Sequence, residues 1–388
     1  MKDVENHNAI KDMTAAFARQ EMAPYAAEWD ATSHFPVDVL KKAASLGLAA
    51  LYVREDIGGS NMSRLEAAVI LEELARACPS TAAFLSIHNM VTWLIDRFGT
   101  EEQRQKYGPR LCSMEIMASY CLTEPGSGSD AASLKTHAKI LNNPADSLNN
   151  IYVINGAKAF ISGGGASDIY LVMARTGGDG PGGISAFIVE KDFPGLGFGA
   201  QEKKLGWKSQ PTAAVTFDDC QVPTENLLGG EGNGFKLAMA GLDGGRVNIA
   251  ACSLGGAAEC LDRATQYAQE RKQFGKAIAD FQATGFKLAD MATNLDAARL
   301  MVHDACIAID MEAPDKTVKA AKAKRFATDA CYQVVDDALQ IHGGYGYLAD
   351  YEIERYKRDL RVHRILEGTN EIMRVIISRD LLSSGRNH

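Results

Sequence analysis

The chain lacks several features that would assign it to a class at once. Its 388 residues contain no apolar run of the roughly 20 residues needed to cross a bilayer. Lys and Arg number 41 against 49 Asp and Glu, and this net charge of −8 argues against nucleic acid, whose phosphates require clustered basic residues. The HExxH, GxSxG and Walker A patterns are absent, and the eight histidines show no metal-ligand spacing. Membrane insertion, nucleic-acid binding and a metal site are therefore not expected.

The eight cysteines form no CxxC pair and are scattered along the chain. This distribution is typical of free thiols in a reducing compartment, and each is expected to be a small buried apolar residue. The N-terminal stretch MKDVENHNAIKDM lacks the Arg-rich amphipathic pattern of an organelle leader. We expect either a protein that works where it is made or a mature chain whose leader has been removed.

The length favours two or three domains, and the composition changes near residues 116 and 230. Residues 1–116 are predicted to be helical. Ser63 precedes an apolar-periodic run and Glu66 follows three residues later, which predicts a helix that starts with a capping box. The segment 80–99 is apolar on nearly every side and is predicted to be buried all round.

Residues 117–230 alternate short β-rich runs with turns rich in Gly, Pro and Asn, which predicts a small antiparallel barrel or sandwich. The runs are MASYCLTE, IYVINGAKAFISG, DIYLVMART, ISAFIVEK and TAAVTFDDC. The insert NNPADSLNN (142–150) is predicted to be a solvated hairpin tip.

Residues 231–388 return to long helices with apolar residues at steps of three and four, the pattern of a helix bundle. One stripe comprises Leu288, Met291, Leu295, Ala298, Val302, Ala305 and Ile309, and a second comprises Ala320, Ala323, Ala327, Ala330 and Val334. The predicted fold class is α+β, with an N-terminal all-α domain, a middle β-barrel domain and a C-terminal four-helix bundle.

Two motifs are open to misinterpretation. Segments 126–131 and 178–183 match GxGxxG/A, but neither lies in the strand–turn–helix context of a dinucleotide site, so both are interpreted as chance. His342, in QIHGGYGY, could act as an acid–base group. Beside two glycines after a helix, it is more typical of a residue that shapes a turn.

Four long motifs lie in order along the chain: YCLTEPGSGSD (120–130), ERKQFGKAIADFQ (270–282), QIHGGYGY (340–347) and RILEGTNEIMR (364–374). Together they resemble the acyl-CoA dehydrogenase family over nearly the whole length. The resemblance implies the three-domain fold above, FAD as cofactor, and a homotetramer built as a dimer of dimers. It also implies desaturation of an acyl-CoA between Cα and Cβ, with electrons passed to electron-transfer flavoprotein, in the mitochondrial matrix or, for a bacterial source, in the cytoplasm.

Within this resemblance Glu367 matches the catalytic base, although by itself it could be an exposed loop acid. An α-proton beside a thioester is only weakly acidic, so the base needs a desolvated pocket that raises its pKa above about 4.3. Gly368 leaves room for substrate or flavin. Some family members carry the base at the position that corresponds to Gly245, which is a glycine here, so Glu367 is the matching carboxylate.

The resemblance also implies the binding residues. The loop along the flavin is matched by Tyr120, Cys121, Leu122, Thr123, Gly128 and Ser129, and the second flavin wall by Phe160, Ile161 and Ser162. Contacts to the FAD of a neighbouring subunit are matched by Arg271, Phe274, Phe281, Gln282, Gln340, His342, Gly343 and Gly344, and further FAD contacts by Thr369, Asn370 and Glu371. Acyl-CoA contacts are matched by Ser129, Asp243, Gly244, Gly245, Arg246, Gly368 and Arg379.

Alternatives to these roles remain open. Phe160 and Ser162 stand where many relatives have Trp and Thr, and plain strand packing is the alternative for Phe160. Arg246 and Arg379 could instead form surface or helix-end salt bridges.

The phrases LSIHNM (85–90), GWKSQPT (206–212), GLDGGRVNIAACSLG (241–255) and GGYGYLADY (343–351) are similar to the branch of the family that converts isobutyryl-CoA to methacrylyl-CoA in valine catabolism. A butyryl-CoA or 2-methyl-branched substrate is the alternative, since one methylene changes pocket affinity by only about 1–3 kcal/mol. An acyl-CoA oxidase would usually carry a large extra C-terminal domain. A non-catalytic scaffold would predict a lost base or a basic surface.

Overall fold

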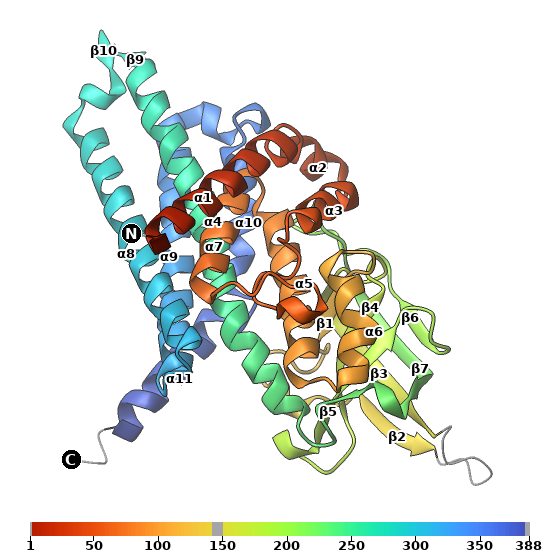
Figure 1. The fold of residues 1–388 in the computed structure, drawn as a ribbon. Helices are drawn as coiled ribbons and strands as arrows, with labels where there is room; N and C mark the ends of the chain where they lie inside the picture. The colour runs from red at the N-terminus through yellow and green to blue at the C-terminus, as the bar shows by residue number, and fades with distance from the viewer. Residues whose placement is uncertain (1, 142–149, 385–388) are drawn as a thin grey trace.

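The computed structural model describes residues 2–141 and 150–384 (Figure 1). The predicted hairpin tip at 142–150 therefore lies, apart from Asn150, outside the described residues. Helices form both ends of the chain, and a sheet lies to one side of them. The N-terminal helices are α1 (Lys2–Phe17), α2 (Ala26–Thr32), α3 (Val37–Ser45), α4 (Arg64–Ala77), α5 (Pro79–Phe98) and α6 (Glu101–Cys112).

The start of α4 confirms the predicted capping box. The Ser63 hydroxyl accepts from the Glu66 N–H at 3.1 Å, and the Ser63 N–H donates to Glu66 Oε2 at 2.7 Å. Helix α5 is buried along most of its length, as predicted, because it lies against α4, α7 and β1.

The middle region forms one eight-stranded sheet. Its strands are β1 (Ala118–Cys121), β2 (His137–Leu141), β3 (Ile151–Ser162), β4 (Ile169–Arg175), β5 (Ile184–Glu190), β6 (Leu196–Phe198), β7 (Thr212–Pro223) and β8 (Leu227–Leu228). The order is β6-β7-β3-β2-β4-β5-β8, with β1 also paired to β4. Most neighbouring strands pair antiparallel, as predicted, but β1 and β2 pair with β4 in parallel. Parallel pairing needs a long connection, and the chain between β1 and β4 provides it.

The C-terminal region contains α7 (Gly234–Glu270), α8 (Gln282–Asp310), α9 (Lys316–His342), α10 (Ile353–Arg361) and α11 (Asn370–Ser384). A short hairpin of β9 (Lys272–Gln273) and β10 (Lys276–Ala277) joins α7 to α8. Helices α7, α8 and α9 pack on one another, and α9 also contacts α10 and α11. Both predicted stripes are confirmed, because most of their members are buried and Leu288, Ile309 and Ala330 lie at their margins.

The helical regions share one hydrophobic core, to which α4, α5, α7, α8 and α9 all contribute. The sheet is tied to the N-terminal helices by Gln103, whose side-chain amide donates to the carbonyls of Glu225 at 2.7 Å and Leu227 at 3.0 Å. All eight cysteines are free and buried, as predicted. No described helix has the length and apolarity needed to cross a membrane.

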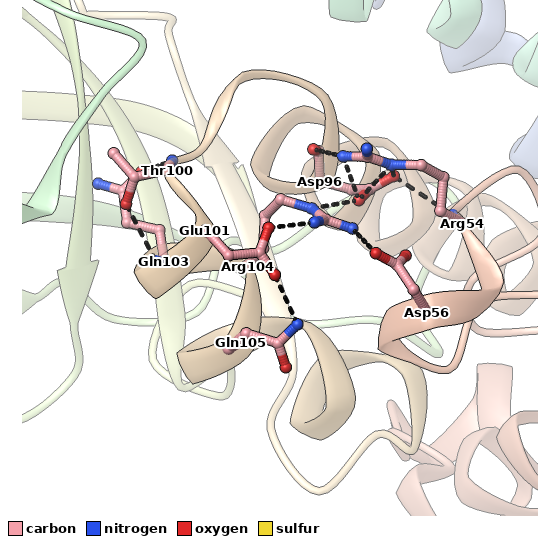
Figure 2. Close-up of polar contacts among 8 residues, drawn as sticks. All are labelled: Arg54, Asp56, Asp96, Thr100, Glu101, Gln103, Arg104 and Gln105. Carbon is pink, nitrogen blue, oxygen red and sulfur yellow. Dashed lines mark hydrogen bonds and ion pairs between the residues drawn. The ribbon is translucent and has the colours of Figure 1, made fainter.

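An ion-pair network fixes the end of α5 against α6 and the loop after α3 (Figure 2). Asp96 accepts from the backbone N–H of Arg54 at 3.2 Å and from its guanidinium, and Arg104 Nε donates to Asp96 at 3.0 Å. Arg104 also pairs with Asp56 at 2.6 Å and with Glu101. Asp96 is therefore a buried charge that pairs with Arg54 and Arg104 and also hydrogen-bonds the backbone of the Arg54 loop.

We expect Asp96→Ala to lower the free energy of unfolding by about 3 kcal/mol, because it leaves the buried Arg104 guanidinium without its central partner. Urea unfolding followed by circular dichroism measures the change. Glu115→Ala, which removes an exposed ion pair to Arg110, is the control and should cost less than about 1 kcal/mol. Equal losses would contradict the structural role of the network.

Candidate active site

Glu367 lies on a short turn between a 3-10 helix (Val362–Arg364) and α11. Its φ is +55° and that of Gly368 is +85°. A left-handed backbone is rarely adopted by residues other than glycine, and here it turns the Glu367 side chain toward α7. A Cβ built on Gly245 of that helix would lie 2.4 Å from Glu367 Oε2. The two positions at which the resemblance allows a base are therefore neighbours in space, and the glycine leaves room for the carboxylate.

Glu367 Oε2 is buried and has no hydrogen-bond partner among the described residues. Burial raises the pKa of Glu367 from 4.5 to about 7, and the positive charges of Arg246 and Lys324 limit the rise. The carboxylate is thus desolvated, with one oxygen free to accept a proton.

Arg246 is buried on α7, one turn from Asp243, and the two pair through Nη1 and Oδ1 at 2.5 Å. Asp243 is held in turn by the Thr317 hydroxyl at 2.6 Å. Burial lowers the pKa of Arg246, against the attraction of Asp243 and Glu367, and its buried Nε has no partner in the described part of the chain. The alternative of a surface salt bridge was wrong for Arg246, whereas Arg379 is exposed on α11.

Two tyrosines lie on other sides of Glu367. Tyr120 of β1 donates to the Ala238 carbonyl at 3.4 Å, and the Tyr52 hydroxyl accepts from Asn248 Nδ2 at 3.0 Å. Burial raises the pKa of both phenols, and the charge of Glu367 adds to the rise. The guanidinium of buried Arg64 stacks over the Tyr52 ring at 3.5 Å from its centroid.

The loop predicted to run along the flavin is tied to the strand that carries the second wall. Lys158 of β3 is fully buried and donates to the Leu122 carbonyl at 3.0 Å and to Glu124 at 2.8 Å. The Ala159 N–H donates to the Thr123 carbonyl at 2.9 Å. The next residue, Phe160, has a φ of +58° and is 67% exposed.

The structure thus brings the predicted loop and wall together and leaves an aromatic ring uncovered beside them. Cys121, Leu122 and Ile161 are buried, Thr123 and Ser162 are half-buried, and Gly128 and Ser129 are exposed.

A third group of predicted residues lies at the far end of the bundle. Arg271, His342, Gly343 and Gly344 line a cleft of about 470 Å³ together with Tyr267 and Tyr345. Phe274, Phe281, Gln282 and Gln340 lie on the hairpin, the start of α8 and the end of α9, and Phe274 is 94% exposed. The His342 ring stacks on Tyr267 at 4.4 Å and its Nδ1 bonds the Ala338 carbonyl, which is the geometry of a structural residue.

Within a single chain this cleft lies far from Glu367. Helix α7 connects the two places, and the 25 residue steps from Gly245 to Glu270 span about 38 Å at 1.5 Å per step. In Figure 1 the β9–β10 hairpin and α11 lie at opposite ends of the bundle.

Comparison with known proteins identifies the family. Models of the N-terminal, middle and C-terminal domains of acyl-CoA dehydrogenases match residues 4–115, 119–220 and 232–382. The chain belongs to the acyl-CoA dehydrogenase family. Members of this family are FAD-dependent flavoenzymes that act on acyl-CoA substrates.

Relatives within the acyl-CoA dehydrogenase family cover nearly the whole chain. Mitochondrial isobutyryl-CoA dehydrogenases of Dictyostelium discoideum and Bos taurus are 56% and 55% identical, over 97% of this chain and 89% of each relative. Butyryl-CoA dehydrogenase of Megasphaera elsdenii has a similar structure, with a TM-score of 0.92, 38% identity and coverage of 97% and 98% of the two chains. A structure described as an electron transferring flavoprotein of Acidaminococcus fermentans matches with a TM-score of 0.93 and 42% identity, over 97% of this chain and 98% of that one.

Sequence analysis did not identify three residues of this region: Tyr52 and Lys324, which interact electrostatically with Glu367, and Arg64, which stacks on Tyr52. Lys324 donates to the Gly368 carbonyl from α9. It lies among the predicted Ala320, Ala323 and Ala327 stripe, and a charged residue on an apolar face is the signal that could have identified it. Nothing local marks Tyr52 or Arg64.

We expect Glu367→Gln to raise the melting temperature of the protein more at pH 8 than at pH 5. The pKa of Glu367 is higher in the folded than in the unfolded state, so protonation of this carboxyl stabilises the folded protein. That contribution to the free energy of unfolding is fully present below pH 4.5 and is lost as pH rises through about 7. Thermal unfolding across this range measures the difference, and Glu115→Gln, at an exposed position outside the site, is the control. A difference from wild type that does not vary with pH would contradict the desolvated carboxylate.

Proposed function

We propose that the protein oxidises isobutyryl-CoA to methacrylyl-CoA in valine catabolism, with Glu367 as the base that removes the Cα proton. The observation that carries this proposal is the half-buried Glu367 side chain, whose Oε2 is buried, has no partner among the described residues and lies close to Gly245. A general base works best when its pKa lies near the working pH, and burial raises that of Glu367 to about 7.

The surrounding residues support proton transfer to Glu367. Arg246 and Lys324 keep enough positive charge near the carboxylate for a substantial ionised fraction at neutral pH. Gly244, Gly245 and Gly368 add no side chains that would exclude the acyl group, and Asp243 fixes the Arg246 guanidinium. Ser129 and Arg379 are exposed positions assigned to the CoA portion.

FAD, when bound, supplies the acceptor for the hydride that leaves Cβ. The residues assigned to FAD binding here are Tyr120, Cys121, Leu122, Thr123, Gly128 and Ser129 in the loop, Phe160, Ile161 and Ser162 in the wall, and Thr369, Asn370 and Glu371 beside the proposed base. The uncovered Phe160 ring in a left-handed backbone fits a flat ligand, since strained backbone concentrates at binding sites.

We assign the cleft lined by Arg271 and His342 to the FAD of a neighbouring subunit. Phe274, Phe281, Gln282, Gln340, Gly343 and Gly344 complete this assignment. The long separation of this cleft from Glu367 supports a homotetramer, a dimer of dimers, in which each FAD site takes residues from two chains. Exposed apolar residues on α8, at its C-cap and on α11 fit subunit contacts: Phe286, Leu300, Ile307, Met311, Leu381 and Leu382.

The isobutyryl substrate is supported by the two relatives of that name at 56% and 55% identity, against 38% for the butyryl-CoA enzyme. Electron-transfer flavoprotein is the proposed electron acceptor. The proposed location is the mitochondrial matrix, as named for these relatives, or the cytoplasm for a bacterial source. A butyryl or 2-methyl-branched acyl-CoA is the second candidate substrate.

We expect Glu367→Gln to retain FAD and to lower the rate of flavin reduction by about 10³-fold or more, because the base is lost while the fold is kept. Anaerobic stopped-flow with isobutyryl-CoA, following absorbance near 450 nm, measures the rate. Glu115→Gln, at an exposed position outside the assigned site, is the control, and its rate should stay close to wild type. Residual turnover near the wild-type rate in Glu367→Gln would remove this residue as the base.

Isobutyryl-CoA should bleach the wild-type flavin faster and at lower concentration than butyryl-CoA or 2-methylbutyryl-CoA. Discrimination of about 10- to 200-fold is expected, since each pair differs by the placement or presence of one carbon. Anaerobic titration with the three thioesters measures it. Preference for butyryl-CoA would overturn the substrate assignment, and rapid peroxide formation under air would indicate an oxidase.

A further inference from the structure

A buried lysine lies beneath the turn that carries Glu367. Lys324 of α9 is 0% exposed, and its Nζ donates to the Gly368 carbonyl at 2.8 Å and to Asn370 Oδ1 at 2.9 Å. One ammonium group therefore binds the residues one and three positions after Glu367. A buried lysine is costly unless it is hydrogen-bonded, so these two acceptors fix where it lies.

Helix α9 also holds the other end of the turn. Asn370 Nδ2 donates to the Thr328 hydroxyl and to Asp329 Oδ1, both at 3.0 Å. The Thr328 hydroxyl donates to the Lys324 carbonyl one turn earlier. Lys324, Thr328 and Asn370 thus form a continuous hydrogen-bonded connection between α9 and the start of α11.

The Glu367 backbone needs such support. A non-glycine residue in the left-handed region is strained by about 1–2 kcal/mol, and strained residues persist only where the surrounding structure fixes them. Gly368 is left-handed as well, and its carbonyl is the group that Lys324 binds. Loss of this bond would let the turn relax and move the Glu367 carboxylate away from Gly245.

The charge of Lys324 acts on the same carboxylate. The charged or titratable groups that act on Glu367 are Arg246 of α7, Tyr120 of β1, Lys324 of α9, and Tyr52. The groups that act on Lys324, or on which it acts, are Glu367, Arg246 of α7, Asp329 of α9, Glu371 of α11 and His363 of the 3-10 helix before Glu367. Lys324 and Arg246 are the two cations among those that face Glu367.

Burial lowers the pKa of Lys324 from 10.5 to about 7, although the attraction of Glu367 raises it. Lys324 and Glu367 therefore titrate in one range and are coupled.

We propose that Lys324 is a positioning residue for proton abstraction: its ammonium fixes the Glu367–Gly368 turn and places a positive charge behind the carboxylate. This inference rests on the proposed role of Glu367 as the base. It assigns to α9 a part in the reaction that neither the sequence motifs nor the related proteins' names indicate.

The test compares Lys324→Met and Lys324→Gln with Lys322→Met, an exposed lysine two residues away on the same helix. In Lys324→Met we expect the acidic limb of kcat/KM to move to higher pH by roughly half a unit or more, because an opposite charge is lost. We also expect kcat to fall about 10- to 100-fold with a smaller change in KM, since the base is misplaced. In Lys324→Gln, which keeps a donor for Gly368, the limb should move with a smaller loss of kcat. An unmoved limb in both variants would overturn the proposal.

A second measurement does not depend on turnover. At pH 7 the loss of melting temperature caused by Lys324→Met should be smaller in a Glu367→Gln background than in wild type, because the attraction between the two side chains is already gone. Folding of Lys324→Met only in the Glu367→Gln background would give the same support. Additive losses, or equal failure to fold in both backgrounds, would show that the two residues are not coupled and would overturn the proposal.

These outcomes are separable from those for the proposed function. Wild type that reduces no acyl-CoA would overturn that function, while the melting-temperature cycle still decides whether Lys324 acts on Glu367. Suppose that wild type is active, Glu367→Gln is inactive, and the acidic limb of the kcat/KM pH profile does not move in the Lys324 variants. This result would support Glu367 as the base and overturn the proposed role of Lys324.

Discussion

The close approach of the Glu367 carboxylate to the α7 backbone at Gly245 is the constraint on which the site depends. Any side chain on Gly245 would displace the carboxylate, and any looser approach would admit water beside it. Water would hydrogen-bond the free oxygen and return the pKa of Glu367 toward its ordinary value. The distance between α7 and the turn therefore decides both where the Glu367 carboxylate lies and how strongly it holds a proton.

Several separate segments of the chain maintain this approach. Helix α7 supplies Gly245 and Arg246, β1 supplies Tyr120, and α9 supplies Lys324. Helix α7 is held in turn by α4, α5, α8 and α9 through the shared core. The position of Glu367 therefore depends on packing between separate regions of the chain.

Burial and charge act in opposite directions on Glu367. Desolvation alone would favour the protonated acid, which cannot remove a proton, and two nearby cations shift the balance toward the carboxylate. Each cation has a further fixed partner: Asp243 for Arg246, and the Gly368 carbonyl for Lys324. The result is a base with a pKa near the pH at which it is proposed to work.

The sequence determined the helix–sheet–helix order, the capping box at Ser63, the apolar stripes of α8 and α9 and the family, because periodicity, capping and long motifs are local signals. Glu367, the proposed base, and Gly245 could both be singled out from the sequence, because both lie in such motifs, and the structure places them side by side. Only the tertiary structure decided that β1 pairs in parallel with β4, that Arg246 is buried, and that Tyr52 and Lys324 lie near Glu367. Those facts depend on contacts between residues far apart in the chain, such as Lys324 with Gly368, and no local pattern specifies which distant backbone a buried side chain will meet.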